Sequence, residues 1–190
     1  MDRSTRLWLL LILAILPGFT EAAQAEPTSP LQSMQIHANR ATSSLLLYRG
    51  EGFQKAHLLR LEEDIRALNA ALLQVANPTS ALRESHLELQ TRLREGASFG
   101  YKEDDMPWGW PLQMSKALRD FLTAARAQQG ADADAELPAK VAYLAVQYLS
   151  RAYIGSFEIA REQPDTYLGQ DERNLVPAID AQLAGLDGKR

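Results

Sequence analysis

Apolar residues recur at alternating steps of three and four positions along most of the chain, and this spacing predicts amphipathic helices. A first helix is predicted over residues 30 to 49. Ser29 can cap its start, Pro30 suits the first helical position, and Gln32 can return the capping hydrogen bond. The expected inward stripe consists of Leu31, Met34, Ala38, Ala41, Leu45 and Tyr48.

A second apolar stripe is one residue out of phase with the first, and Gly50 and Gly52 lie where the phase breaks. Two helices or a sharp hinge are therefore expected. The second helix should end near Ala76, and its stripe is Leu58, Leu61, Ile65, Leu68, Leu72 and Val75. Asn77 is then predicted to cap a third helix that Pro78 opens. Its inward residues would be Leu82, His86, Leu89 and Leu93.

Helical periodicity fails from Gly96 to Trp110 and returns at Pro111, which is expected to begin a fourth helix that ends near Gly130. The inward residues of this helix would be Leu118, Phe121, Leu122 and Ala125. The run ADADAE, residues 131 to 136, is polar and has the composition of a solvated linker.

A fifth helix is predicted from Pro138 to about Gln163, and it is the most apolar helix expected after residue 25. Its main stripe is Val141, Ala145, Tyr148, Ala152, Gly155 and Ile159, and a second stripe holds Tyr143, Val146, Tyr153 and Phe157. Apolar residues on two sides are typical of a helix buried between neighbours. A final helix is expected from about Asp171 to Leu186, with its start or a kink at Pro177. Its inward residues would be Leu175, Ile179, Leu183 and Leu186.

Alternating runs rich in Val, Ile and Thr, which are the pattern of β-strands, do not occur in the sequence. The chain is therefore predicted to be all-α, an antiparallel bundle of five to six helices.

Residues 1 to 25 have the layout of a secretory signal peptide, because Arg3 and Arg6 precede an apolar run and a small-residue site ends at Ala25. The apolar run is shorter than the roughly 20 residues that span a bilayer. We expect cleavage after Ala25, a single domain over residues 26 to 190 without a membrane span, and a periplasmic or secreted location. The chain has no cysteine, so neither a disulfide nor a lipoprotein anchor is expected.

The formal net charge is -4, and charges of both signs are interspersed. No clustered basic face is present, which argues against nucleic acid as a partner. The sequence also has no cysteine nucleophile, no G-x-S-x-G turn, no phosphate-binding glycine loop and no C-x-x-C-H haem motif. No cofactor and no catalytic residue are predicted, and a non-enzymatic protein is favoured over an enzyme.

The three histidines are His37, His57 and His86, and none belongs to an H-E-x-x-H or E-x-x-H pair that would place two metal ligands on one helix face. No metal site is predicted from them. His37 and His57 are expected at the surface, whereas His86 lies on an apolar stripe and is expected to be partly buried and hydrogen-bonded.

The aperiodic segment SFGYKEDDMPWGWP, residues 98 to 111, contains the first candidate binding residues. They are Tyr101, Glu103, Asp104, Asp105, Trp108 and Trp110. The acids could coordinate Ca²⁺ or receive a cationic partner group, and tryptophans beside carboxylates also suit a sugar. The tryptophans could instead seal one end of the bundle. An extended backbone would point both the same way, whereas a turn at Gly109 would splay them.

Tyr148, Arg151 and Tyr153 on the fifth helix form the second candidate site, because hydroxyls and a guanidinium inside a bundle could line a small-molecule pocket. The alternative is that these rings fill the core and their hydroxyls reach its rim.

The expected function is that of an exported, non-enzymatic helical protein that binds an envelope protein or a small ligand in an accessory or sensor-like role. The alternative is a cell-envelope enzyme that acts on a glycan through the acidic and aromatic segment 99 to 111.

Overall fold

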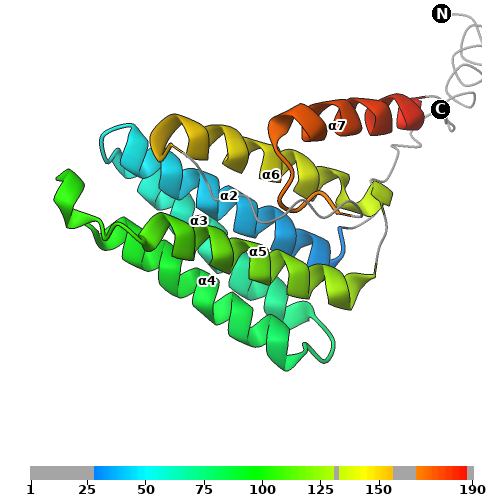
Figure 1. The fold of residues 1–190 in the computed structure, drawn as a ribbon. Coiled ribbons are helices and arrows are strands. Elements are labelled where there is room, and N and C mark those ends of the chain that lie inside the picture. The colour runs from blue at the N-terminus through cyan, green and yellow to red at the C-terminus, as the bar shows by residue number, and fades with distance from the viewer. Residues whose placement is uncertain (1–27, 131–132, 156–165, 188–190) are drawn as a thin grey trace, which may run out of the picture.

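The computed structural model describes residues 28–130, 133–155 and 166–187, and throughout these ranges all regular structure is helical (Figure 1). The α-helices of the described chain are α2 (Pro30–Gly50), α3 (Lys55–Gln74), α4 (Ser80–Ser98), α5 (Trp110–Gln129), α6 (Ala133–Tyr153) and α7 (Glu172–Asp187), with a short 3-10 helix, η1 (Glu103–Asp105). This confirms the all-α prediction. The predicted signal peptide and the predicted last part of the fifth helix lie outside the described residues.

Helix α2 is the centre of the bundle, because it packs against α3, α4, α5 and α6 (Figure 1). Its predicted capping box forms, since the Ser29 hydroxyl accepts the Gln32 N–H and the Gln32 side chain accepts the Ser29 N–H. Met34, Ala38, Ala41 and Leu45 of the predicted stripe are fully inaccessible, and Leu31 and Tyr48 at its ends are partly buried. The polar residues Gln35, Asn39 and Thr42 are buried as well, which the amphipathic pattern did not predict.

The break between the first two helices is confirmed. Helix α2 ends at Gly50, and Gly52 and Phe53 both have positive φ, +79° and +61°. Glycine adopts this left-handed conformation without the strain that a Cβ brings, so Gly52 permits the sharp turn into α3.

The predicted cap of the third helix is wrong. Helix α4 begins at Ser80, and the Thr79 hydroxyl accepts the Leu82 N–H at 3.2 Å. Asn77 has φ +52° and stands outside the helix, so Pro78 precedes the cap instead of opening the helix. A threonine hydroxyl serves as well as an asparagine amide here, because both present an oxygen to the free N–H groups of the first turn.

The predicted linker at 131 to 136 is also wrong, because α6 already begins at Ala133. Glu136 is buried and forms an ion pair with Arg126 of α5, with Arg126 Nη2 3.2 Å from Glu136 Oε2. A paired carboxylate can remain in a protein interior that would exclude a solitary one. Pro138 consequently lies inside α6 and does not start it.

The inward face of α6 differs from the prediction. Val141, Ala145, Tyr148 and Ala152 of the predicted main stripe are exposed. Tyr143 and Val146 of the predicted second stripe are buried, together with the polar residues Gln147 and Ser150. The inward side of α6 is set by its packing on α2, where Asn39 Nδ2 donates to the Ala139 carbonyl at 3.4 Å. Helix α6 ends at Tyr153, ten residues earlier than predicted, and Gly155 follows with φ +98°.

The segment before α7 is held by hydrogen bonds of buried polar groups to α2 and α6, and α2 is joined to α5 in the same way. The Tyr167 hydroxyl donates to Gln35 Oε1 at 3.2 Å, and Gln35 Nε2 donates to Gln129 Oε1 at 2.7 Å. The Tyr143 hydroxyl accepts the Gly169 N–H at 3.1 Å. Burial raises the pKa of Tyr167, so its hydroxyl stays protonated and available as a donor.

Helix α7 begins at Glu172, where Asp171 Oδ1 accepts the Arg173 N–H at 2.9 Å. Pro177 lies inside this helix and does not start it. Leu175 and Ile179 are buried as predicted, but Leu183 is 45% exposed. The apolar contacts of α7 are therefore concentrated in its first half, and Gln182 of its second half accepts a hydrogen bond from Lys140 of α6 at 2.9 Å.

Helices α2 and α6 run in the same direction. Gln32, near the start of α2, donates to the Ala135 carbonyl near the start of α6, and Gly50 contacts Tyr153 where both helices end. The prediction of antiparallel neighbours therefore does not hold for this pair. Among the helices of the described ranges, none combines the length and apolar character needed to cross a membrane.

Candidate functional site

Arg49 fastens the end of α4 to the end of α2. Its Nη1 donates to the carbonyls of Gly96 at 2.9 Å and Phe99 at 3.3 Å, and its Nη2 donates to the carbonyl of Gly100 at 3.4 Å. The last carbonyls of a helix have no partner within the helix, so the guanidinium satisfies groups that would otherwise need water. Burial lowers the pKa of Arg49, but a guanidinium keeps its charge at neutral pH.

An aromatic cluster surrounds the same guanidinium. Arg49 lies over the rings of Phe53 at 5.2 Å and Phe99 at 5.7 Å from its carbon Cζ. The Phe53 ring in turn makes edge contacts with Tyr48 at 5.1 Å and Tyr101 at 4.4 Å between ring centroids. These contacts hold the α2–α3 turn against residues 99–109, which we call the 99–109 loop.

Trp110 seals the bundle beneath this loop. The side chain is 1% exposed, and its Nε1 donates to the Arg92 carbonyl at 3.3 Å. Phe99 packs edge-on against it at 5.8 Å. A Cβ on Gly96 would fall 2.3 Å from Trp110 Cζ2, so only glycine at 96 admits the indole in this position. Trp110 is therefore a core residue.

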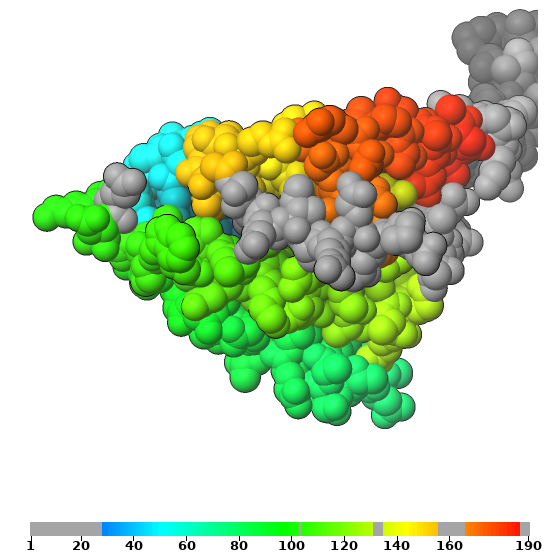
Figure 2. All heavy atoms as spheres, in the orientation of Figure 1, coloured from blue at the N-terminus to red at the C-terminus, as the bar shows by residue number. Residues whose placement is uncertain are grey.

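Trp108 points the opposite way and is 98% exposed. It occupies the first central position of a turn that the Trp110 N–H closes on the Pro107 carbonyl at 2.9 Å. Gly109 follows with φ −83° and ψ −6°, the values of the second central position of a type I turn. The two tryptophans are thus splayed, as a turn at Gly109 would require. The green segment between α4 and α5 protrudes from the end of the bundle (Figures 1 and 2).

The acids of the loop have different environments. Asp105 Oδ2 accepts the Lys102 N–H at 3.0 Å and lies against Gly100, so this carboxylate shapes the loop. Asp104 is exposed and has neither a hydrogen bond nor an ion pair within the described part of the chain. Glu103 belongs to η1, and its side chain lies outside the described structure.

The second predicted site does not lie inside the bundle. Tyr148 is 52% exposed, and Arg151 is an exposed residue that pairs with Glu172 of α7. The Tyr153 hydroxyl donates to Glu51 Oε1 at 3.1 Å. The Tyr153 contact places the end of α6 beside the α2–α3 turn, whereas Arg151 serves to attach α7.

The histidines are more involved than their sequence positions suggested. His37 Nδ1 lies 3.0 Å from the buried carboxylate of Asp64, and His57 Nε2 lies 2.9 Å from Glu51 Oε2. Both are therefore partly buried and paired, whereas free surface positions were predicted. His86 is buried and hydrogen-bonded to Gln90, as predicted. Across the described ranges, no three His, Asp or Glu side chains gather as metal ligands would.

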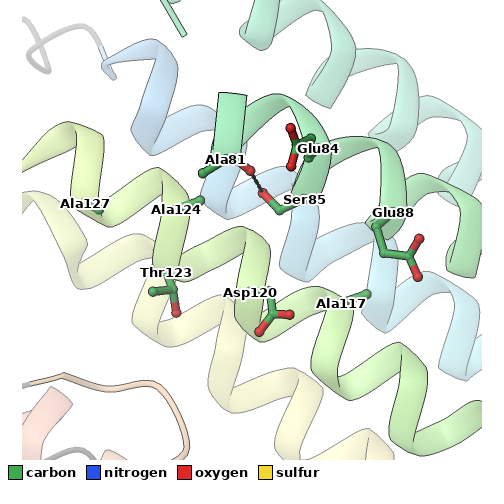
Figure 3. A pocket seen from close by; sticks show the side chains of 9 residues that line it. All are labelled: Ala81, Glu84, Ser85, Glu88, Ala117, Asp120, Thr123, Ala124 and Ala127. Atoms are coloured by element: carbon green, nitrogen blue, oxygen red, sulfur yellow. Dashed lines mark hydrogen bonds between the residues drawn. The ribbon is translucent and has the colours of Figure 1, made fainter. Parts of the chain in front are cut away.

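A shallow groove between α4 and α5 is a surface feature that sequence reasoning missed (Figure 3). Small side chains such as Ala81 and Ala124 leave the space between the helices open. Glu84, Glu88 and Asp120 also line the groove. Two of these acids are neutralised, since Glu88 accepts from Arg92 at 2.7 Å and Asp120 pairs with Lys116. Alanines on two separate helices become a groove only once the helices pack, so one helix pattern could not reveal it.

Comparison of the chain with models of protein families, with curated proteins and with solved structures finds no match.

Proposed function

We propose that this chain is an exported, single-domain helical bundle that binds a protein partner through the 99–109 loop. In this role it is a non-enzymatic accessory or sensor-like protein, and Trp108 is the central contact residue. The observation that carries the proposal is the 98% exposure of Trp108 on a turn that the buried Trp110 fixes in place.

Tryptophan is enriched among the few residues that dominate binding energy at protein interfaces. An isolated exposed apolar residue needs no explanation by itself. Trp108, however, lies on the same loop as the 81% exposed Tyr101. Hydrogen bonds of Arg49 to Gly96 and of Trp110 to Arg92 hold the two ends of this loop. A surface fixed in advance loses less conformational entropy when it binds.

Export is supported by the signal-peptide layout of residues 1 to 25, with cleavage after Ala25 and a periplasmic or secreted product. The absence of cysteine suits a mature protein that relies on its apolar core for stability. Its consecutive helices would alternate in direction, while α2 and α6 lie parallel.

The proposal is tested with a photo-crosslinking amino acid at position 108 in the full chain, expressed in its own cells. The matched control carries the same group in place of Leu73, an 88% exposed leucine at the far end of α3. A discrete protein adduct from position 108 and none from position 73 is the expected result. Identical adduct patterns from the two positions, or no adduct from position 108, would overturn the proposed function.

A further inference from the structure

The chemistry of the 99–109 loop specifies the kind of partner group it can hold. An indole with open faces attracts a cation through the negative charge density of its ring, and tryptophan is the best of the aromatic residues at this. Trp108 is 98% exposed, and no ring or guanidinium of the described chain contacts it. The Tyr101 ring, by contrast, already packs against Phe53, although the residue remains 81% exposed.

The charge of the loop has the matching sign. Between residues 99 and 109 the sequence has three acids and one base, Lys102. Asp104 is exposed and carries no ion pair within the described residues, whereas Asp105 is occupied by the Lys102 N–H. Arg49 donates to the carbonyls beneath the loop and interacts with the charge of Asp105, so it leaves Asp104 without an ion pair within the described residues. An excess of negative charge on an exposed tip attracts cations and repels phosphates and other anions.

We propose that the 99–109 loop binds a lysine or arginine side chain of an extended, basic segment of the partner. The cation stacks on the face of Trp108, and the Asp104 carboxylate supplies the opposite charge. This inference rests on the proposed function, since it names the chemistry of the partner at the same surface. A glycan could stack on the same indole and donate its hydroxyls to Asp104, so the experiment below compares cationic peptides with a glycan.

The test uses the purified protein labelled with 5-fluorotryptophan. Its tryptophans are Trp8, Trp108 and Trp110, and Trp8→Phe and Trp108→Phe assign their fluorine resonances. Tetra-arginine, tetra-lysine, tetra-glutamate and chitotetraose are titrated as probes. The cationic peptides should shift the Trp108 resonance alone, and their affinity should fall about 2- to 5-fold in Trp108→Ala, the range of an exposed cation–π contact. Asp104→Asn should also weaken them, with a further loss in Asp104→Lys.

The matched control is Asp180→Asn, which removes a charge from an exposed aspartate of α7 and should leave the affinities unchanged. A shift caused by chitotetraose and not by the cationic peptides would overturn the inference in favour of a glycan. Equal losses in Asp104→Asn and Asp180→Asn would also overturn it, because net charge alone would then explain the binding. If position 108 still crosslinks a protein in either case, the proposed function stands and only the basic segment is refuted.

Discussion

Gly96 of α4 lies directly beneath the indole of Trp110, so that a Cβ at position 96 would approach Trp110 Cζ2 to 2.3 Å and Leu45 Cδ2 to 2.8 Å. This contact joins the end of α4 to the start of α5 and to the central helix α2. It fixes the position of Trp110 and with it the turn that presents Trp108.

Gly96→Ala should therefore destabilise the protein, although alanine is the better helix former by about 1 kcal/mol. Overpacking costs about 1 to 3 kcal/mol, and the 2.3 Å approach to a rigid indole places the cost at about 2 to 3 kcal/mol. A net loss of about 1 to 2 kcal/mol in the free energy of unfolding is therefore expected in urea denaturation. The control is Gly185→Ala in α7, where a Cβ would meet open space and the helix preference should raise the stability. If Gly96→Ala and Gly185→Ala change the free energy of unfolding equally, the close contact between Gly96 and Trp110 is not important for stability.

Trp110→Ala and Trp108→Ala should differ sharply in stability. Truncation of the buried indole leaves a cavity and should cost about 3 to 5 kcal/mol. Truncation of the exposed one should change the free energy of unfolding by less than about 0.5 kcal/mol. Both values come from the same denaturation experiment, and a cost above about 2 kcal/mol for Trp108→Ala would contradict its placement in solvent.

Arg49→Lys should loosen the 99–109 loop while it keeps the positive charge. Lysine presents a single ammonium group, so it cannot reproduce donation from two guanidinium nitrogens to the carbonyls of Gly96, Phe99 and Gly100. The free energy of unfolding should fall by about 1.5 to 3 kcal/mol, which is the range for hydrogen bonds to a charged group. Hydrogen exchange should accelerate first at the amides of the 99–109 loop. Unchanged protection of these amides would show that Arg49 does not hold the loop in place.

The stability should depend on pH through His86. Burial lowers the pKa of His86 in the folded state, and Arg94 lowers it further. The unfolded chain, with a histidine pKa of about 6.5, therefore binds this proton more readily. Neutral His86 makes its full contribution to the free energy of unfolding above about pH 6.5. This contribution is lost as the pH falls from there towards the pKa of His86 in the folded protein.

Urea denaturation from pH 8 to pH 5 measures this effect, with His86→Gln as the control because glutamine cannot titrate. The variant should lose less stability over that interval than the wild-type protein. Parallel losses in both proteins would assign the pH dependence to other groups.

Much of the fold could be predicted from local pattern alone. The stripes through Leu89 and Phe121 are buried, and those through Leu45 and Leu68 are buried at their centres and partly buried towards their ends, because each helix obtains its core face from the spacing of its own residues. The wrong face of α6 shows where this reasoning fails. Tyr148 is apolar enough for a core but is 52% exposed, whereas the polar Gln147 is buried and hydrogen-bonded to Tyr143. Packing on α2 decides which side of α6 is buried, and no single helix pattern contains that information.

The candidate loop could be located from the sequence, but its two tryptophans could not be distinguished. Both have the same neighbours in the chain, glycine and proline. Their different burial depends on Gly96 and Arg92, which lie in another helix and receive one indole only. Arg49 was missed for a similar reason, since its carbonyl partners are about 50 residues away in the sequence.

We propose that Trp108 contacts the partner directly, whereas Trp110 only supports the loop that carries Trp108. The most direct measurement is the Kd of the partner crosslinked at position 108 for the wild-type protein, Trp108→Ala and the exposed control Leu73→Ala. Loss of a central interface tryptophan typically costs at least about 2 kcal/mol, so Trp108→Ala should bind roughly 30-fold more weakly and Leu73→Ala should match the wild type. Equal Kd values for all three proteins would contradict the account.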